Sequence, residues 1–398
     1  MASARSNNEE HRLSRVDQAN TPACKMTWEN QRTGKVLLLA PNSPDTLGGM
    51  EHFVRELSRG LERRGYGVEI LHRSNAAPPW TNRQFGPTAR KIVASTLGYF
   101  IGRIAQTKLD DDVVAVISNS DVGYYPLRPT SKQTRLIQFY HGTYRGQAEA
   151  IRPFIRYLGY LYLKWWNAMV LERLSGRDKQ VLVCSDQVGQ EVRRFFGHPS
   201  TTVWYPLDLS RFSPRDPQTS RRELGLPPIG PLGVFVGSAH ATKGFAVVRR
   251  LIEAFPEVCW ALALRGSVPE DLRINPHVRI FQNMPNEKIP LLYSAADFAL
   301  SPSRYDAFPY AVCEALACGS PVIASPSGAS CLFLKDPPLN RFLATHVDAM
   351  PEFMNAVREL LRDPGFYRRE VLTKVRPMIE EVMSPENWWR RFLSVTGL

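Results

Sequence analysis

The stretch "GKVLLLAPNSPDTLGGMEHFVRELSRGLERRGYGVEILHR", residues 34–73, decides the fold class. It opens with an apolar run that predicts a short buried strand, and a loop rich in proline and glycine follows. The next segment places Phe53, Leu57 and Leu61 four residues apart, which predicts an amphipathic helix ending at Gly65. A second apolar run then predicts another strand. This order of strand, glycine loop, helix and strand is a βαβ unit, which favours a parallel sheet.

The same alternation of apolar runs and helical segments continues along the chain in two series. The stretch "YPLDLSRFSPRDP" at 205–217 separates them. A chain of 398 residues is also too long for one ordinary hydrophobic core. We therefore predict an α/β fold with two Rossmann-like, doubly wound domains that face a cleft, where ligands bind at the carboxyl ends of strands. Further strands are predicted at 113–120, 135–142, 180–186 and 202–207, and then at 231–238, 259–266, 278–283 and 297–303.

Several features narrow the class of protein. Residues 1–33 have few aliphatic side chains and no periodicity, which predicts a flexible tail, and they lack the apolar core of a signal peptide. Six scattered cysteines, without a Cys-x-x-Cys or Cys/His cluster, indicate free thiols in a reducing compartment and no metal site. The most apolar stretch, 157–171, contains Lys164 and is shorter than the roughly 20 residues that a membrane span needs. A cytoplasmic protein, soluble or peripheral on the inner face of the membrane, is expected.

The positive charge is concentrated in the first half. The net charge is +12; residues 1–205 hold 28 Lys and Arg against 18 Asp and Glu, whereas 206–398 hold 22 against 20. An anionic partner is thus expected at the first half, although solubility alone also explains a net charge. The segment 152–177 is rich in Tyr, Trp and aliphatic residues. A basic, aromatic helix of this kind can lie in a lipid interface, and the alternative is a helix buried under the sheet. Its basic residues are Arg152, Arg156, Lys164, Arg173 and Arg177. The sequence lacks the signatures of nucleic-acid-binding modules, so no nucleic acid is expected.

A second stretch, "SPSRYDAFPYAVCEALACGSPVIAS" at 301–325, carries the chemistry. Asp306 and Glu314 are its only acids, and isolated carboxylates are costly to bury unless they are paired or hydrogen-bonded. Pro309 is predicted as the first helical residue, which leaves the free N–H groups of Tyr310 and Ala311 as an anion site. Carboxylates accept hydrogen bonds from sugar hydroxyls, so a phosphate flanked by hydroxyl-rich groups, as in a nucleotide sugar, fits this pattern. A capping Asp and a solvated Glu are the alternative.

Asp306 and Glu314 are separated by seven residues, and "ALACGSPVIAS" follows them. This pattern resembles the Glu-x7-Glu motif of retaining glycosyltransferases of family four, which have the two-Rossmann-domain GT-B fold. The resemblance implies that Asp306 binds the donor sugar and Glu314 the nucleotide ribose. It also implies that Phe308, Tyr310 and Ala311 flank the diphosphate.

Three other stretches resemble parts of the same family. "GGME", with Gly48 and Gly49, is similar to the Gly-Gly loop whose backbone approaches the diphosphate, or it is a plain turn. "FYHGT" contains His141, which resembles the histidine that reaches the donor sugar at the reacting centre, and a satisfied core or loop histidine is the alternative. The third stretch, "VFVGSAHATKG", is similar to the family's Gly-Arg…Lys-Gly loop; it holds Gly237, Ser238 and Lys243. Here the lysine would stabilise charge on the departing diphosphate, and a surface lysine is the alternative.

The sequence departs from the family at three places. Asp306 replaces the usual Glu, which shortens the reach by one methylene, and Ser238 stands where the family has Arg, which removes one phosphate-directed cation. The linker also lacks the usual Asn-Gly. The resemblance implies an acceptor-side domain at 34–205, a nucleotide-sugar-binding domain at 206–380, and a closing helix at 381–398 that crosses back onto the first domain.

We therefore predict a retaining, metal-independent glycosyltransferase. The co-substrate would be a nucleoside-diphosphate sugar of the UDP or GDP type, with no other cofactor. No acid is obviously placed as a nucleophile, so front-face attack by the acceptor hydroxyl is favoured over double displacement. The expected acceptor is an envelope glycan or a lipid-linked molecule. The alternatives are a small soluble natural product as acceptor, or a catalytically silent nucleotide-binding partner.

Overall fold

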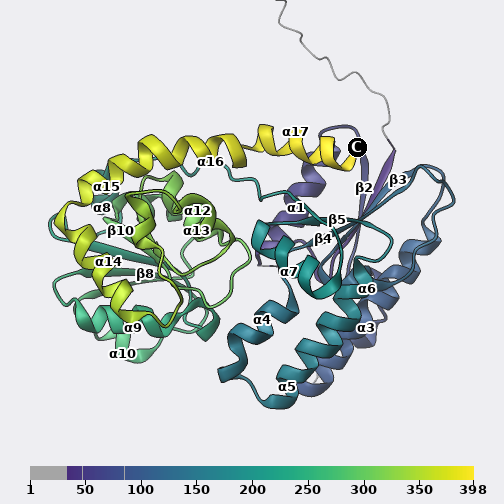
Figure 1. The fold of residues 1–398 in the computed structure, drawn as a ribbon, viewed down its shortest axis with the longest axis horizontal. Helices are drawn as coiled ribbons and strands as arrows, with labels where there is room; N and C mark the ends of the chain where they lie inside the picture. Colours follow the sequence, from purple (N-terminus) through teal and green to yellow (C-terminus); the bar gives the residue numbers. More distant parts are fainter. Residues whose placement is uncertain (1–33, 47, 85) are drawn as a thin grey trace, which may run out of the picture.

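The computed structural model describes residues 34–398 except 47 and 85, so the predicted tail lies outside the described residues. It has two separate β-sheets, each flanked by helices and each belonging to one half of the chain (Figure 1). In both sheets every neighbouring pair of strands is parallel. The predicted α/β fold with two doubly wound sheets is confirmed.

The first sheet has the strand order β2-β1-β3-β4-β5-β6. Its strands are β1 (Lys35–Leu39), β2 (Gly67–Leu71), β3 (Val113–Asn119), β4 (Arg135–Tyr140), β5 (Gln180–Val183) and β6 (Thr201–Thr202). The helices of this half are α1 (Gly49–Glu62), α2 (Arg73–Ala76), α3 (Pro87–Thr107), α4 (Tyr144–Ile151), α5 (Tyr157–Leu161), α6 (Arg173–Ser175) and α7 (Asp186–Phe196), with the π-helix η4 (Tyr162–Glu172). Short 3-10 turns are η1 (Pro79–Asn82), η2 (Ser120–Tyr124) and η3 (Arg152–Phe154).

The second sheet has the order β11-β10-β7-β8-β9. Its strands are β7 (Leu232–Ser238), β8 (Cys259–Arg265), β9 (Val278–Gln282), β10 (Phe298–Ser301) and β11 (Val322–Ala324). The helices are α8 (Pro217–Glu223), α9 (Phe245–Ala254), α10 (Glu270–Arg273), α11 (Ile289–Ala295), α12 (Tyr310–Ala317), α13 (Gly328–Phe333), α14 (Met350–Arg362), α15 (Pro364–Glu370), α16 (Arg376–Met383) and α17 (Pro385–Thr396). Shorter turns are η5 (Ala241–Lys243), η6 (Asn286–Lys288), η7 (Leu339–Phe342) and the π-turn η8 (Val371–Val375).

Successive residues of β1 enter two different cores. Val36 and Leu38 belong to the large cluster that also holds the apolar face of α1, whereas Leu37 and Leu39 belong to a smaller cluster with α3. Side chains alternate across a strand, so helices cover both faces of the first sheet. This explains why the strand reads as a continuous apolar run rather than as an alternating one.

The last helix, α17, returns to the first half of the chain and lies across it, as the yellow ribbon in Figure 1 shows. Trp389 packs where a Cβ on Gly60 of α1 would meet its ring at 1.8 Å, and the Arg64 guanidinium lies 4.1 Å from the centre of that ring. The Gln180 side chain donates to the Val395 carbonyl at 2.7 Å. These contacts hold the last helix against the first half, and the predicted domain bounds, the closing helix at 381–398 included, stay predictions.

Three local features differ from the sequence-based expectations. The strand predicted at 202–207 is only the two-residue β6, and the residues that follow it are not in a strand. The helix α1 ends at Glu62, and Gly65, with φ of +87°, follows in a turn rather than ending the helix itself. The segment 152–177 contains a π-helix, η4, that is neither fully buried nor fully exposed: Trp165 and Trp166 lie on its exposed side. The buried side of η4 is formed by residues such as Asn167, Ala168 and Leu171.

Candidate functional site

The loops after β7 and β10 bring two predicted residues together. These strands are neighbours in the second sheet, so their carboxyl ends meet at one edge. Lys243 Nζ lies 2.5 Å from Asp306 Oδ2, and the two side chains are 40% and 16% exposed. We expected these residues to serve a diphosphate and a sugar; here they form an ion pair with one another.

Gly244 makes this approach possible. Its φ is +65°, and a Cβ at this position would lie 1.6 Å from the Pro302 carbonyl oxygen. The Arg304 N–H also donates to the Thr242 carbonyl at 2.9 Å, which ties the two loops together. Only glycine can adopt this left-handed conformation while it lies so close to another segment of backbone. The glycine that follows Lys243 is therefore required by the packing of the two loops. The other predicted residues of this loop, Gly237 and Ser238, close β7 and are partly buried.

The amino-terminus of α12 follows directly. Pro309 is the N-cap rather than the first helical residue, because its ψ of 113° is extended, and the helix begins at Tyr310. Phe308 is buried and meets the Tyr205 ring edge-on, with centroids 5.7 Å apart. The N–H groups of Tyr310 and Ala311 fall in the first turn, where no intrahelical carbonyl can accept from them. The structure thus places all three predicted diphosphate-flanking residues at one helix terminus.

Glu314 lies one turn further along α12. Burial raises the pKa of its carboxyl to about 7, although the positive charges of Arg265 and Arg211 and the neighbouring Tyr293 hydroxyl act in the opposite direction. Sequence reasoning missed these three residues. Arg265 closes β8 and Arg211 lies in the linker between the two halves, so neither stands near Glu314 in sequence.

The glycine loop of the first half faces the same region. Gly48 is the N-cap of α1 and Gly49 is its first residue. A Cβ on Gly48 would lie 2.0 Å from Glu51 Oε2, whereas a Cβ on Gly49 would meet nothing within 4 Å. His52, in the first turn of α1, contacts the Tyr310 ring edge-on with centroids 6.1 Å apart. The amino-termini of α1 and α12 therefore lie close together, one from each half.

His141 follows β4 and has both ring nitrogens hydrogen-bonded within the protein. Its Nδ1 lies 2.6 Å from the Tyr205 hydroxyl and its Nε2 lies 2.9 Å from Asn119 Oδ1. The ring also stacks on Phe139, with centroids 4.8 Å apart. Burial lowers the pKa of His141 to about 3, so the ring is neutral at ordinary pH. The sequence singled out His141 but gave no sign of Tyr205 or Asn119 as its partners.

Tyr305 joins the two halves beside Asp306. Its hydroxyl accepts from the Thr143 N–H at 2.8 Å and donates to Glu191 Oε2 at 2.9 Å. Thr143 stands two residues after His141, so this contact links the loop after β4 to the loop after β10. The loops that carry predicted residues of both halves are thereby tied to one another. The sequence suggested no role for Tyr305.

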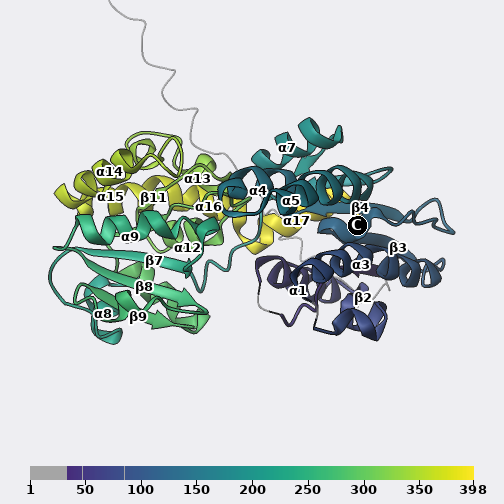
Figure 2. The same cartoon turned by 90° about the horizontal axis from the view of Figure 1, so that it is seen from below.

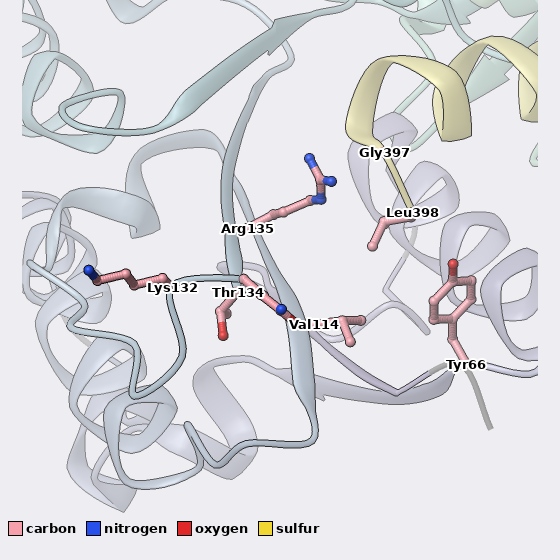
Figure 3. Close-up of a pocket in the computed structure, with 8 residues that line it drawn as sticks. Tyr66, Val114, Lys132, Thr134, Arg135, Gly397 and Leu398 are labelled. Carbon is pink, nitrogen blue, oxygen red and sulfur yellow. The ribbon is translucent and has the colours of Figure 1, made fainter.

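A separate cavity of about 490 Å³ lies at the opposite end of the first sheet. Figure 3 shows its polar lining, with Arg135 and Lys132 on one side and Tyr66 and Leu398 on the other. These residues adjoin the amino-terminal ends of β2, β3 and β4, whereas His141 and Asn119 adjoin the carboxyl ends. The cavity is thus not part of the candidate site.

Within the described residues, no group of three or more His, Cys, Asp or Glu side chains is arranged to hold a metal ion. The five described cysteines are unpaired, and Cys24 lies outside the described part. The search of the described helices also found none with the length and apolar character required to cross a membrane.

Comparison with known proteins identifies the family. Residues 47–211 match the model named Glycosyltransferase Family 4, and residues 230–363 match the model named Glycosyl transferases group 1. The chain therefore belongs to the family-four (group 1) glycosyltransferases, as the acid-x7-Glu motif suggested. It is an enzyme of a retaining, typically metal-independent family that uses nucleotide sugars.

Curated relatives are distant. The D-inositol 3-phosphate glycosyltransferase 2 of Catenulispora acidiphila is 27% identical over 378 residues, which cover 80% of this chain and 82% of the relative. The D-inositol 3-phosphate glycosyltransferase of Mycobacterium leprae (strain TN) is 23% identical over 354 residues, covering 79% and 80%.

Solved structures support the fold. Sucrose-phosphate synthase from Thermosynechococcus elongatus superposes with a TM-score of 0.72 at 17% identity, covering 91% of this chain and 98% of that one. The Anabaena protein HepE, solved in complex with UDP and glucose, has a TM-score of 0.63 at 15% identity, covering 92% and 99%. WaaG, a glycosyltransferase involved in lipopolysaccharide biosynthesis, has a TM-score of 0.64 at 14% identity, covering 88% and 100%. These likenesses confirm the GT-B fold.

Proposed function

We propose that this glycosyltransferase moves a sugar from a nucleoside-diphosphate sugar to a hydroxyl of a lipid-linked acceptor on an anionic membrane surface in the cytoplasm. The carrying observation is a set of exposed apolar side chains in the basic aromatic segment, residues 152–177. The exposed fractions are 67% for Tyr157, 79% for Leu158, 56% for Trp165 and 48% for Trp166. Several large apolar side chains that are this exposed on a protein surface typically mark an interaction site.

Basic side chains surround these apolar groups. Arg152, Arg156, Arg173 and Arg177 are exposed in the same segment. Arginines beside tryptophans suit a surface of anionic headgroups above acyl chains, because the cations meet phosphates while the rings enter the interface. The charge of this segment thus favours an anionic lipid surface as the occupant.

The segment also contacts the loop that carries Asp306. The Arg304 guanidinium lies 4.9 Å from the centre of the Phe154 ring, and Arg304 precedes Asp306 by two residues. The helix α4, which leads into the segment, lies on the side of the first half nearest the second half in both views (Figures 1 and 2). An acceptor whose lipid stays in the membrane could therefore present its hydroxyl at the proposed reacting centre.

The donor would lie between α1 and α12. In this proposal Asp306 accepts hydrogen bonds from the donor sugar, Glu314 holds the ribose, and the diphosphate meets the first N–H groups of α12. The acceptor hydroxyl attacks the anomeric carbon from the side of the departing diphosphate: the bond between that carbon and the phosphate oxygen breaks, the new glycosidic bond forms, and the diphosphate takes the hydroxyl proton. Lys243 and the helix terminus stabilise the growing negative charge.

Co-sedimentation with vesicles tests the membrane part of the proposal. The protein should sediment with phosphatidylglycerol vesicles at low salt and much less with phosphatidylcholine vesicles. Replacing both Trp165 and Trp166 by Ser should weaken binding by about tenfold or more, because each ring buries apolar area in the interface. Ile229→Ser is the matched control, since Ile229 is 87% exposed on the second half. Equal binding of both vesicle types, or no effect of the tryptophan change, contradicts the proposal.

The curated relatives favour a second candidate, transfer to a small phosphorylated polyol. Their names specify D-inositol 3-phosphate as the acceptor. Incubation with a panel of UDP, GDP and ADP sugars separates the candidates: transfer to free inositol phosphate without vesicles supports the second. Transfer that requires a lipid-linked acceptor supports the first. If no donor is transferred or hydrolysed, the chain is a silent binding partner.

A further inference from the structure

A chain of hydrogen bonds runs along the carboxyl edge of the first sheet. It begins at Cys184 and passes through Tyr205, His141 and Asn119 to the Leu39 carbonyl. Four of these residues end or directly follow β1, β3, β4 and β5, which are consecutive neighbours in the sheet. The fifth, Tyr205, lies in the segment that leads from the first half to the second. We call this set the edge hydrogen-bond chain.

The donor and the acceptor of each hydrogen bond can be assigned, because some of the groups can only accept. The Leu39 carbonyl accepts from Asn119 Nδ2 at 3.0 Å, so the amide oxygen of Asn119 faces His141. Because that oxygen cannot donate, His141 Nε2 carries the ring proton. A neutral ring then leaves Nδ1 as an acceptor, and the Tyr205 hydroxyl donates to it at 2.6 Å.

This arrangement leaves no ring nitrogen of His141 available for proton transfer. Asn119 and Cys184 are fully buried and Tyr205 is only 5% exposed, so water does not compete for these bonds. Tyr205 gives its proton to His141, and the Cys184 thiol therefore acts as the weak donor to the tyrosine oxygen. His141 can contribute to turnover through its position and not as an acid or a base.

Tyr205 also contacts the donor side. Its ring is parallel to that of Tyr310, with an interplanar angle of 5° and centroids 5.1 Å apart. Tyr310 is the first residue of α12, whose amino-terminus is the proposed diphosphate site. One side chain thus touches both the histidine of the first half and the anion-binding helix of the second.

We propose that Tyr205 is a positioning residue for sugar transfer. Its hydroxyl fixes His141 as the neutral Nε2–H tautomer, and its ring keeps His141 in register with the amino-terminus of α12. This inference rests on the proposed donor site. It accounts for a tyrosine in the linker, where sequence reasoning found only a loose match to the family.

Tyr205→Phe tests the hydroxyl while the stacked ring is kept. We expect kcat to fall by about tenfold, the size of one lost hydrogen bond, while the Kd for UDP or GDP changes less than about twofold. Tyr367→Phe is the matched control, because Tyr367 is equally buried and its hydroxyl donates to Glu359 at 2.7 Å, away from the site. It should leave kcat unchanged.

A double-mutant cycle with His141→Ala separates positioning from general packing. If Tyr205 acts through His141, Tyr205→Phe should have no further effect on kcat in the His141→Ala background. Additive losses overturn the inference, and so does a loss of kcat that comes with equally weakened nucleotide binding and a lowered melting temperature.

Nitrogen-15 NMR of the histidine rings gives a readout that does not depend on activity. His141 should show a protonated Nε2 and a bare Nδ1, and Tyr205→Phe should yield a mixture of tautomers while Tyr367→Phe does not. An imidazolium or an Nδ1–H tautomer in the unaltered protein overturns the inference. Should the protein transfer no sugar at all, the proposed function fails, and the tautomer still decides whether Tyr205 fixes His141.

Discussion

The carboxyl edges of the two sheets are built from different chemistry. The edge of the second sheet gathers charge: Lys243 pairs with Asp306 at 2.5 Å, and Glu314 stands desolvated one turn into α12. The edge of the first sheet carries the neutral edge hydrogen-bond chain, with His141 and Tyr205 at its centre. The difference suggests two separate tasks under the proposed function: the charged side chains of the second edge would interact with the charge of the donor, and the neutral side chains of the first edge would hold a fixed geometry. Substitutions test this comparison, because removing a charged group and removing an orienting hydrogen bond should lower kcat by different amounts.

Loss of Lys243 should have the largest effect. Lys243→Ala removes the cation that, in the proposed donor site, would face the leaving diphosphate, and we expect kcat to fall by about 100-fold, as for loss of one electrostatic group in a transition state. Steady-state kinetics with a transferred donor measures this, with Lys288→Ala as control because Lys288 is an exposed lysine in η6.

The same variant leaves Asp306 without its ion pair, so Asp306→Asn should be measured beside it. If Lys243→Ala cost no more than a hydroxyl deletion in the edge hydrogen-bond chain, charge would not distinguish the two edges. Activity should also survive a strong chelator, and its loss with rescue by a divalent ion would contradict the role given to Lys243.

Gly244→Ala should sharpen the structural part of the comparison. The added methyl would lie 1.6 Å from the Pro302 carbonyl, and the residue has a left-handed φ of +65°. We expect the free energy of unfolding to fall by about 2–4 kcal/mol, since both strain and a backbone clash are introduced. Gly225→Ala is a close control: its φ is +63° but a Cβ there meets nothing within 4 Å, so only strain, about 1 kcal/mol, is added. Chemical denaturation measures both, and equal losses would show that the loops separate freely.

Much of the second edge could be predicted from the sequence, because its parts are close together in the chain. Asp306, the N–H groups of α12 and Glu314 fall within nine residues, and the resemblance of the loop that holds Lys243 to the family's Lys-Gly loop indicated that lysine. The ion pair between Lys243 and Asp306 could not be predicted, because it depends on how two loops pack around Gly244.

The first edge could be predicted only in outline. The sequence indicated His141 at a strand end, but its partners Asn119, Cys184 and Tyr205 come from three other segments, and no local pattern joins them. Strand order and register decide that these ends are neighbours, and a single sequence does not reveal either. The same holds for the contact of Tyr305 with Thr143, which depends on how the two halves meet.

Glu314→Gln should show that a charged Glu314 lowers the stability of the fold and strengthens nucleotide binding. The pKa of Glu314 is raised from 4.5 to about 7, so the folded state holds this proton more tightly than the unfolded state, and stability is lost as pH rises through that interval. The Gln variant avoids this loss. Its unfolding free energy should exceed that of the unaltered protein by about 1–3 kcal/mol at pH 8 and match it near pH 4.

The same variant should bind UDP or GDP about tenfold more weakly at pH 8, because a carboxylate accepts more strongly from the ribose hydroxyls than an amide does. The difference should shrink below pH 7, where Glu314 is protonated. Thermal shift and calorimetry at both pH values measure the two effects, and a variant less stable at pH 8 would show that Glu314 is paired rather than desolvated.

Cys184→Ala should have the smallest effect and bears most directly on the separate tasks of the two edges. The thiol is a weak donor at the far end of the edge hydrogen-bond chain, and the alanine removes it without touching the bond between Tyr205 and His141. We expect kcat to fall less than about threefold, because the lost bond is worth well under 1 kcal/mol, and the affinity for the nucleotide to be unchanged. If kcat fell as much as in Lys243→Ala, the first edge would also have to stabilise charge in the transition state. A weak bond between neutral groups cannot supply that much stabilisation. Orientation would then no longer be the distinct task of the first edge.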